Sequence, residues 1–293
     1  MLRLVLGLLL TTSSLPTRAG DPEFAIDVMS VLSKAGCNAG TCHGNLNGKG
    51  GFKLSLRGED ARFDYHSLVL ASRGRRINAP VPARSLFLQK ATGGIAHRGG
   101  IRFGTESPEY QLLESWLRQG ARGPSPDAPK VVRLDVQPSQ AIVVDPQREL
   151  QISVIAHYSD DTSRDVTDRA CYEMSNLTAA ATPGGRVVRS DYGETTLIVR
   201  YLQQQLAVPI AFTRDRPDFQ WADPPESNAI DHHVFTKLRR LRINPSPLST
   251  DLVFLRRAYL DAIGRLPTSD EAKLFANDHT ADKRSRLIDA LLV

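Results

Sequence analysis

The sequence is poor in the residue types from which most metal and disulfide sites are built. Its 293 residues include three cysteines, seven histidines and three methionines. There is no second close pair of cysteines and no pair of histidines separated by three residues, so a tetrahedral zinc site lacks ligands. Beyond the N-terminus, no apolar run is long enough to cross a bilayer. The lack of ligand pairs argues against a zinc site, and the lack of long apolar runs excludes a bundle of transmembrane helices.

The overall composition is that of a folded chain with several domains. Hydrophobic residues make up 41% and charged residues 24%, and the length suffices for two or three domains. The net charge of +5 reflects scattered arginines with local clusters at 73–76 and 237–242. The second cluster alternates with leucines at helical spacing, which is typical of a solvated helix face and not of a nucleic-acid patch.

The first 19 residues have the pattern of a secretory signal peptide. A basic start precedes the apolar run Leu4–Leu10, and a small-x-small cleavage site ends at Ala19. The apolar run is too short to span a membrane. We therefore expect an exported protein, located in the periplasm or at the cell surface, with no nucleic-acid partner and no transmembrane segment.

Two cysteines and a histidine stand together after the first predicted helix. Cys37 and Cys42 are separated by four residues, and His43 follows directly. In the common haem-attachment signal the cysteines are two residues apart; their thiols add to the porphyrin vinyl groups and the histidine ligates the iron. Small residues between Cys37 and Cys42 would absorb the longer spacing in a turn. Three alternatives stay open at this point: a disulfide, a zinc site, or unrelated surface residues.

The surrounding pattern is that of a small helical domain. Residues 21–35 form one apolar stripe at helical spacing, with Asp21 as the expected N-cap and Gly36 as the stop. A second helix begins with Ser107 as N-cap and Pro108 at its first position. A domain that opens and closes with a helix, with the cysteine loop between, suits a cytochrome c.

The sixth ligand of such a haem is expected to be a histidine. Methionine is the common sixth ligand of such a haem. Met29 lies upstream on the first helix and Met174 in another domain, so neither is placed to be that ligand. His66 is interpreted as a surface residue. His97 stands between glycine pairs in a loop that can approach a flat cofactor, and it is the favoured distal ligand. An open sixth position is the other option.

Several short motifs together resemble a known family. They lie at 35–44, 51–58, 74–77 and 97–100, followed by a closing helix with Tyr110 and Trp116. On these motifs, residues 21 to about 123 resemble the planctomycete-type cytochrome c domain found at the N-terminus of large exported proteins. The resemblance implies one covalent haem c on Cys37 and Cys42, with His43 as axial ligand, and places His97 in the glycine-rich stretch.

The middle of the chain has the pattern of a β-sandwich. After a proline-containing linker at 124–130, residues 131–213 show some seven short strands with turns between them, which predicts an antiparallel immunoglobulin-like fold. The turn at 157–167 resembles a signature of bacterial immunoglobulin-like domains of surface proteins, with Asp161 replacing a glycine. We expect a spacer, with surface or polysaccharide contact as the other option. Cys171 is expected to be a buried thiol.

The last part of the chain is predicted to be helical. After a linker at 214–226, residues 227–293 carry apolar residues at helical spacing, and Thr268 offers an N-cap. This segment resembles the opening of an uncharacterised helical domain of planctomycete proteins. The pattern runs to the last residue without a stop, so we expect a truncated, partial α-helical domain.

The sequence thus predicts a multidomain protein with an all-α cytochrome c-like domain at 20–123, an all-β immunoglobulin-like sandwich and a partial helical domain. Its expected role is electron transfer through one haem c to or from an unidentified redox partner protein, without enzymatic activity in this chain. Two histidine ligands would give a lower reduction potential than histidine and methionine. The alternative is a surface binding or adhesion protein whose sandwich acts and whose Cys37 and Cys42 form a disulfide.

Overall fold

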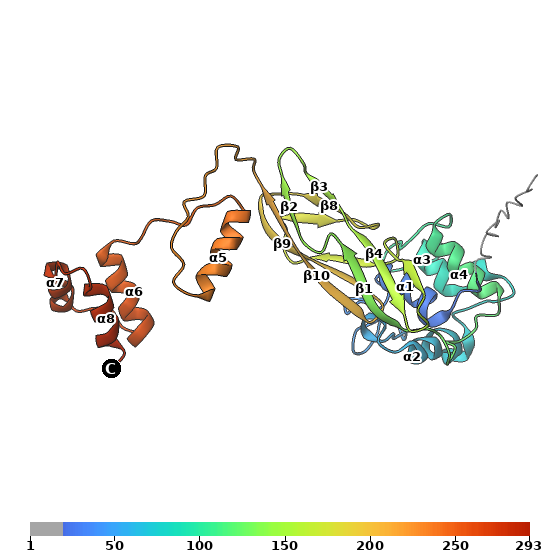
Figure 1. The fold of residues 1–293 in the computed structure, drawn as a ribbon. Coiled ribbons are helices and arrows are strands. Elements are labelled where there is room, and N and C mark those ends of the chain that lie inside the picture. Colours follow the sequence, from blue (N-terminus) through green and yellow to red (C-terminus); the bar gives the residue numbers. More distant parts are fainter. Residues whose placement is uncertain (1–19) are drawn as a thin grey trace, which may run out of the picture. The chain divides into compact units, whose positions relative to one another are not determined.

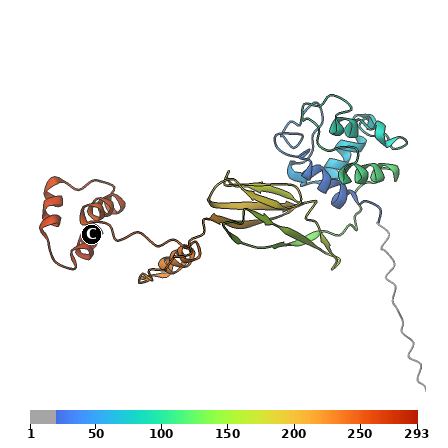
Figure 2. The ribbon, with the colours of Figure 1, turned by 90° about the horizontal axis from the view of Figure 1, so that it is seen from above.

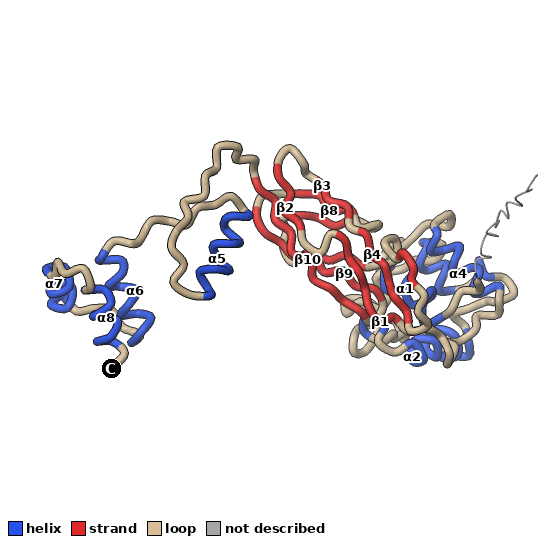
Figure 3. Tube along the Cα trace, in the orientation of Figure 1, coloured by secondary structure: helices blue, strands red, loops and turns tan. Residues whose placement is uncertain are grey.

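The computed structural model describes residues 20–293, so the predicted signal peptide lies outside the described residues. The chain divides into two compact units, one ending at Asp215 and the other running from Arg216 to Val293. Among the helices of the described part, none is both long and apolar enough to cross a membrane. The structure combines helices and β-sheets (Figure 3), as the sequence predicts.

The first unit begins with a region of short helices and turns (Figure 1). Between residues 20 and 123 its only β-pairing is an isolated bridge from Lys49 to Phe52. Glu23, not the predicted Asp21, caps the first helix, because its carboxylate accepts a hydrogen bond from the backbone N–H of Ala25. The helices are a π-helical turn at Phe24–Val28, α1 at Met29–Lys34, α2 at Ala61–Tyr65, α3 at Leu86–Thr92 and α4 at Pro108–Arg118.

The second region of this unit is a β-sandwich. Figure 2 shows its strands in separate layers. The sheets have the orders β1-β4-β5, β2-β10-β9-β6 and β3-β8-β7. The strands are β1 Val131–Gln137, β2 Ala141–Val144, β3 Glu149–Gln151, β4 Ser153–Tyr158, β5 Ser163–Asp165, β6 Cys171–Met174, β7 Ala179–Ala181, β8 Arg186–Arg189, β9 Gly193–Tyr201 and β10 Gln204–Thr213.

The sandwich differs from the predicted one in two respects. First, the apolar stretch at 149–156, whose pattern alone suits a single strand, forms two strands in different sheets, because the buried Ile152 leaves the ladder and donates its N–H to the carbonyl of Gly185 at 2.8 Å. In addition, β2 pairs in parallel with β10, from Ala141 opposite Ile210 to Val144 opposite Thr213. Alternation along one strand does not reveal which sheet a strand joins, so neither feature was accessible to the sequence pattern.

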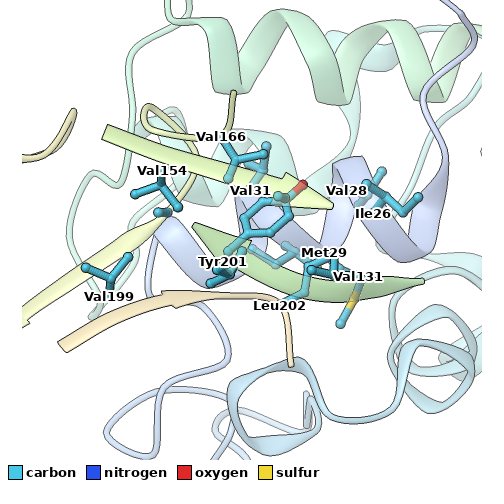
Figure 4. Packing of buried hydrophobic residues seen from close by; sticks show 14 of the residues in the cluster. Ile26, Val28, Met29, Val31, Val131, Val154, Val166, Val199, Tyr201 and Leu202 are labelled. Atoms are coloured by element: carbon cyan, nitrogen blue, oxygen red, sulfur yellow. The ribbon is translucent and has the colours of Figure 1, made fainter. Parts of the chain in front are cut away.

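One continuous hydrophobic core joins the helical region to the sandwich (Figure 4). Met29 of α1 is completely buried, and Tyr201 and Leu202 at the β9–β10 turn belong to the same cluster. At the same junction Arg169 forms an ion pair with the buried Asp27 at 2.5 Å. The segment at 124–130 has no regular secondary structure, but the regions on either side of it pack directly together.

The second unit consists of helices. Thr268 caps α7 with a complete capping box to Glu271, as its position predicts. A small apolar cluster of Leu255, Tyr259 and Phe275 joins α6 to α7. The helices are α5 Ala229–Arg240, α6 Asp251–Ile263, α7 Ser269–Asn277 and α8 Lys283–Leu291.

Candidate functional site

The loop that carries both cysteines is a series of hydrogen-bonded turns directly after α1. Gly36 ends the helix in a left-handed conformation, with φ of 71°. The chain then folds back on itself, because the N–H of Cys42 donates to the carbonyl of Ala39 at 2.8 Å and that of His43 to the carbonyl of Cys37 at 3.0 Å. The extra two residues between the cysteines are therefore accommodated in a turn.

Close packing inside this loop requires Gly44. A Cβ atom at position 44 would lie 2.0 Å from the carbonyl oxygen of Asn38, a distance that no real side chain occupies. Asn38 itself is buried, and its amide donates to the hydroxyl of Ser33 on α1 at 2.8 Å. The loop is thus fixed to the helix from which it emerges.

His43 is oriented by the segment that follows the loop. Its Nδ1 lies 3.0 Å from the carbonyl oxygen of Phe52, and its ring centroid is 4.6 Å from that of Phe52. Since a carbonyl can only accept, Nδ1 carries the proton and Nε2 keeps its lone pair. Partial burial lowers the pKa of His43, so the neutral imidazole that a metal requires prevails at neutral pH.

His97 lies opposite His43 with its ring parallel to it. The two ring centroids are 6.2 Å apart and the ring planes differ by 7°. Nδ1 of His97 is held 3.1 Å from the carbonyl oxygen of Gly100, which again leaves Nε2 with its lone pair. Two imidazoles that bind one metal ion from opposite sides, with bonds of about 2 Å, have centroids about 6 Å apart. The observed separation fits that arrangement.

Arg102 connects the two segments that carry these histidines. Its Nε donates to the carbonyl of Ala35 at 2.7 Å, and its Nη1 donates to the carbonyl of Gly99 at 2.9 Å. Ala35 is the C-cap residue of α1, and Gly99 belongs to the loop of His97. The guanidinium therefore sets where the His97 loop lies against the cysteine loop.

The three cysteines of the chain are free thiols in this structure. Burial raises the pKa of Cys37 to about 11, so this sulfur is protonated at neutral pH. Burial also raises the pKa of Cys171, which lies in β6. In the described part of the chain, no group of three or more His, Cys, Asp or Glu side chains has a metal-binding arrangement. A covalent haem does not need such a group of ligands, unlike a zinc ion. The cysteine sulfurs bond to carbon atoms of the porphyrin, and only the two axial positions of the iron take protein ligands.

Two residues that support the site were not recognised from the sequence. Arg76, which belongs to the basic cluster at 73–76, is buried; it donates to three backbone carbonyls and its guanidinium lies 4.8 Å from the centroid of the Phe52 ring. Asp64 is fully buried and accepts hydrogen bonds from the N–H of Ser55 at 2.5 Å and its hydroxyl at 2.9 Å. Both hold the segment 51–55 against His43. Neither has a motif that signals burial.

The other sulfur and imidazole candidates lie apart from this arrangement. Met29 is buried in the core of the unit and Met174 lies in β6 of the sandwich. His66 is exposed at the end of α2 and has no hydrogen bond to the site residues. The structure thus brings together Cys37, Cys42, His43 and His97 within adjacent loops, and leaves the remaining candidates outside.

Comparison with known proteins locates one family along the chain. Residues 229–293 match the family described as PSCyt2, a protein of unknown function (DUF1549). The matched segment coincides with the helical domain expected from residue 227 and supports that part of the resemblance to planctomycete-type multidomain proteins. No curated protein matches the sequence. A cytochrome c domain is not among the matches, so the haem site stays a prediction.

Solved structures with some likeness include two of the surface-layer protein SbsC. Domains 1–6 of that protein align with a TM-score of 0.27 and 16% identity, over 31% of this chain and 14% of theirs. Domains 4 and 5 align with a TM-score of 0.21 and 17% identity, over 29% of this chain and 53% of theirs. At these TM-scores the likeness establishes no common fold.

Proposed function

We propose that residues 20–215 form an exported c-type cytochrome that transfers electrons through one haem c. Cys37 and Cys42 would carry the thioether bonds, His43 would be the proximal ligand and His97 the distal one. The observation that carries the proposal is the pair of parallel imidazoles, 6.2 Å apart, beside the loop that holds two free thiols.

The residues present fit this cofactor. When bound, the haem supplies an iron that takes up and releases one electron at a time. The chain's own contribution is to hold both imidazoles in the tautomer with a proton on Nδ1, through the carbonyls of Phe52 and Gly100. Such hydrogen bonds fix the orientation of the ring and make the unprotonated Nε2 a stronger ligand for a metal ion. Two histidine ligands favour a lower potential than a methionine would give.

The sandwich supports this site more directly than a flexible spacer would. Its β9–β10 turn packs in the same core as α1, the helix that ends at the cysteine loop. The side-chain amide of Gln203 in that turn donates to the carbonyl of Gly58 at 3.3 Å. We infer that the sandwich holds the helical region in place, and that surface or polysaccharide contact would be a secondary role.

The first experiment is a pyridine haemochrome spectrum on protein exported from a strain that attaches c-type haem. The matched control is the double variant Cys37→Ala, Cys42→Ala. A c-type spectrum that survives acid–acetone extraction, and that is lost in the double variant, is the expected result. Colourless wild-type protein without a pair of titratable thiols would reject the cytochrome and support the disulfide-containing adhesion protein instead.

A further inference from the structure

One turn of the sandwich contains an asparagine with the sequence context of a glycosylation acceptor. Asn176 is followed by Leu177 and Thr178, which matches the pattern Asn-x-Ser/Thr in which x is not proline. Of the eight asparagines in the chain, Asn176 alone has this context, because Asn244 is followed by a proline. A match of three residues also arises by chance, so the surroundings of the side chain decide whether it can accept a sugar.

The three residues lie in an exposed turn between β6 and β7. Asn176 is exposed, and Leu177 beside it has 92% of its surface exposed. The backbone of the turn is anchored at Thr178, whose carbonyl accepts hydrogen bonds from the N–H groups of Ser190 at 2.9 Å and Asp191 at 3.0 Å. The acceptor side chain is therefore presented on a fixed turn at the surface.

The hydrogen bonds of the Asn176 amide are compatible with a sugar on its nitrogen. Oδ1 accepts from the backbone N–H of Thr178 at 3.0 Å, and Nδ2 donates to the carbonyl of Glu194 at 2.9 Å. Nδ2 carries two protons, and within residues 20–293 it makes this one hydrogen bond. One N–H is thus open to substitution while the other keeps its contact with Glu194, so the product fits the same turn.

The hydroxyl of Thr178, which the acceptor pattern also requires, is accessible. Among the described residues, no hydrogen bond involves its Oγ1. Beside it lies Gly193, where even an added Cβ atom would be 3.7 Å from this oxygen. An enzyme can therefore contact the hydroxyl without breaking an interaction of the folded turn.

The turn lies at the end of the sandwich away from the helical region. Glu194, which contacts Asn176, stands near the start of β9, whereas Tyr201 at the other end of β9 belongs to the core shared with α1. The strand separates these two residues by roughly 24 Å. A glycan on this turn is therefore remote from the loops of His43 and His97.

We propose that Asn176 is the acceptor of an N-linked glycan. In the reaction, Nδ2 forms a bond to C1 of a hexose, and the bond from C1 to a phosphate oxygen of the donor breaks. The leaving diphosphate takes the electron pair, and Nδ2 gives up one proton to a base of the transferring enzyme. The donor is a sugar diphosphate, carried on a lipid or on a nucleoside. The proposal requires no haem, and it depends on the proposed function only through export, when the donor is lipid-linked.

The test is peptide mass mapping of the full chain recovered from the host that encodes it. Trypsin releases residues 170–186 as one peptide, and electron-transfer fragmentation assigns an added mass to a single residue. We expect most of this peptide to carry at least one hexose on Asn176. The variants Asn176→Gln and Thr178→Ala should lose the sugar, and Thr178→Ser should keep it. The matched control is Asn277→Gln, at an exposed asparagine outside the pattern, which should leave the sugar in place.

A chain without residues 1–19 distinguishes the two donors. Sugar on Asn176 in this form identifies a nucleotide-linked donor, and sugar on the exported chain alone identifies a lipid-linked donor; both results support the proposal. Unmodified Asn176 in the full chain overturns it, as does sugar that remains on the peptide in Asn176→Gln and therefore belongs to a serine or threonine. A glycosylated chain without haem would reject the cytochrome alone, and a haem-containing chain with unmodified Asn176 would reject the acceptor alone.

Discussion

Single residues at the site are constrained by backbone groups more than by other side chains. His43 and His97 each have Nδ1 fixed by a carbonyl oxygen, and the carbonyls belong to segments that are themselves anchored. The ring of Phe52, whose carbonyl holds His43, contacts both that imidazole and the guanidinium of Arg76. The orientation of an imidazole here follows from the backbone path of its neighbours.

The thiol of Cys37 is expected to be unreactive in protein without haem. With a pKa of about 11 its thiolate fraction at pH 8 is roughly two hundredfold lower than that of a thiol with an ordinary pKa near 8.5. Iodoacetamide at pH 8 should therefore modify Cys37 about two orders of magnitude more slowly than a cysteine-containing model peptide, as followed by peptide mass mapping. Equal rates would show that Cys37 is not buried in solution.

Asp64 should make the stability of the helical region depend on pH. Burial raises its folded-state pKa from 3.8 to about 6, so the folded chain binds more protons than the unfolded chain between those values. Its contribution is fully present below pH 3.8 and is lost as the pH rises through 6. A pKa difference of about 2 corresponds to about 3 kcal/mol of unfolding free energy.

The variant Asp64→Asn isolates this effect, because the amide can keep both contacts with Ser55 without a charge. Urea unfolding of wild type and variant between pH 4 and 7 is the measurement. The stability of wild type relative to the variant should decrease across this range and level off above about pH 6. Parallel pH profiles would contradict the raised pKa.

At the scale of elements, the site is an assembly of loops positioned by α1. The helix ends at Gly36, the cysteine loop folds back onto it, and Arg102 ties the His97 loop to its last carbonyl. The sequence singled out the cysteine loop, its turn and the His97 loop, because cysteine spacing and paired glycines are local signals; the roles of these residues toward a haem stay predictions. The roles of Arg76, Asp64 and Arg102 could not be predicted, since each depends on segments far apart in sequence.

In the proposed haem-containing protein, removal of the Arg102 guanidinium should loosen His97 without releasing the haem. In Arg102→Ala, the two hydrogen bonds to Ala35 and Gly99 are lost, so His97 would leave the sixth position more often. We expect a partial change from low-spin to high-spin absorption and at least tenfold faster carbon monoxide binding. Arg102→Lys should restore part of the low-spin spectrum.

Two comparisons keep that experiment specific. His97→Ala sets the limit of complete loss of the proposed distal ligand, and Arg98→Ala, an exposed neighbour, should leave the spectrum unchanged. A normal low-spin spectrum in Arg102→Ala, with unaltered carbon monoxide binding, would show that His97 is held by other contacts.

At the scale of the whole molecule, the first unit is one folded body made of two kinds of structure. The patterns of residues 20–123 and 131–213 were recognisable separately, as a helical and a strand-rich segment. The continuity of their core was not, because the residues that join them, such as Met29 and Leu202, look like ordinary apolar residues of their own segments. The composition of the linker at 124–130 therefore suggested that the helical region and the sandwich are more independent of each other than their packing shows.

The helical region and the sandwich should consequently unfold together. In protein containing residues 20–215, we expect circular dichroism and tryptophan fluorescence to report the same denaturation midpoint; Trp116 is the tryptophan of this unit and lies in the helical region. Leu202→Ala should lower the stability reported by both signals by about 2–3 kcal/mol. The control Leu177→Ala, at an exposed position, should change neither. Separate midpoints would show two independent domains.

The parallel pairing of β2 with β10 has a mechanical consequence. Thr213 closes the sandwich, and its strand is bound to β2 over four residue pairs, from Ile210 with Ala141 to Thr213 with Val144. Tension applied beyond Thr213 acts along this ladder, so the bonds between the two strands bear the load in shear and must fail together. An antiparallel hairpin pulled from its open end would unzip one bond at a time. The end of the sandwich toward the second unit is therefore built to resist stretching.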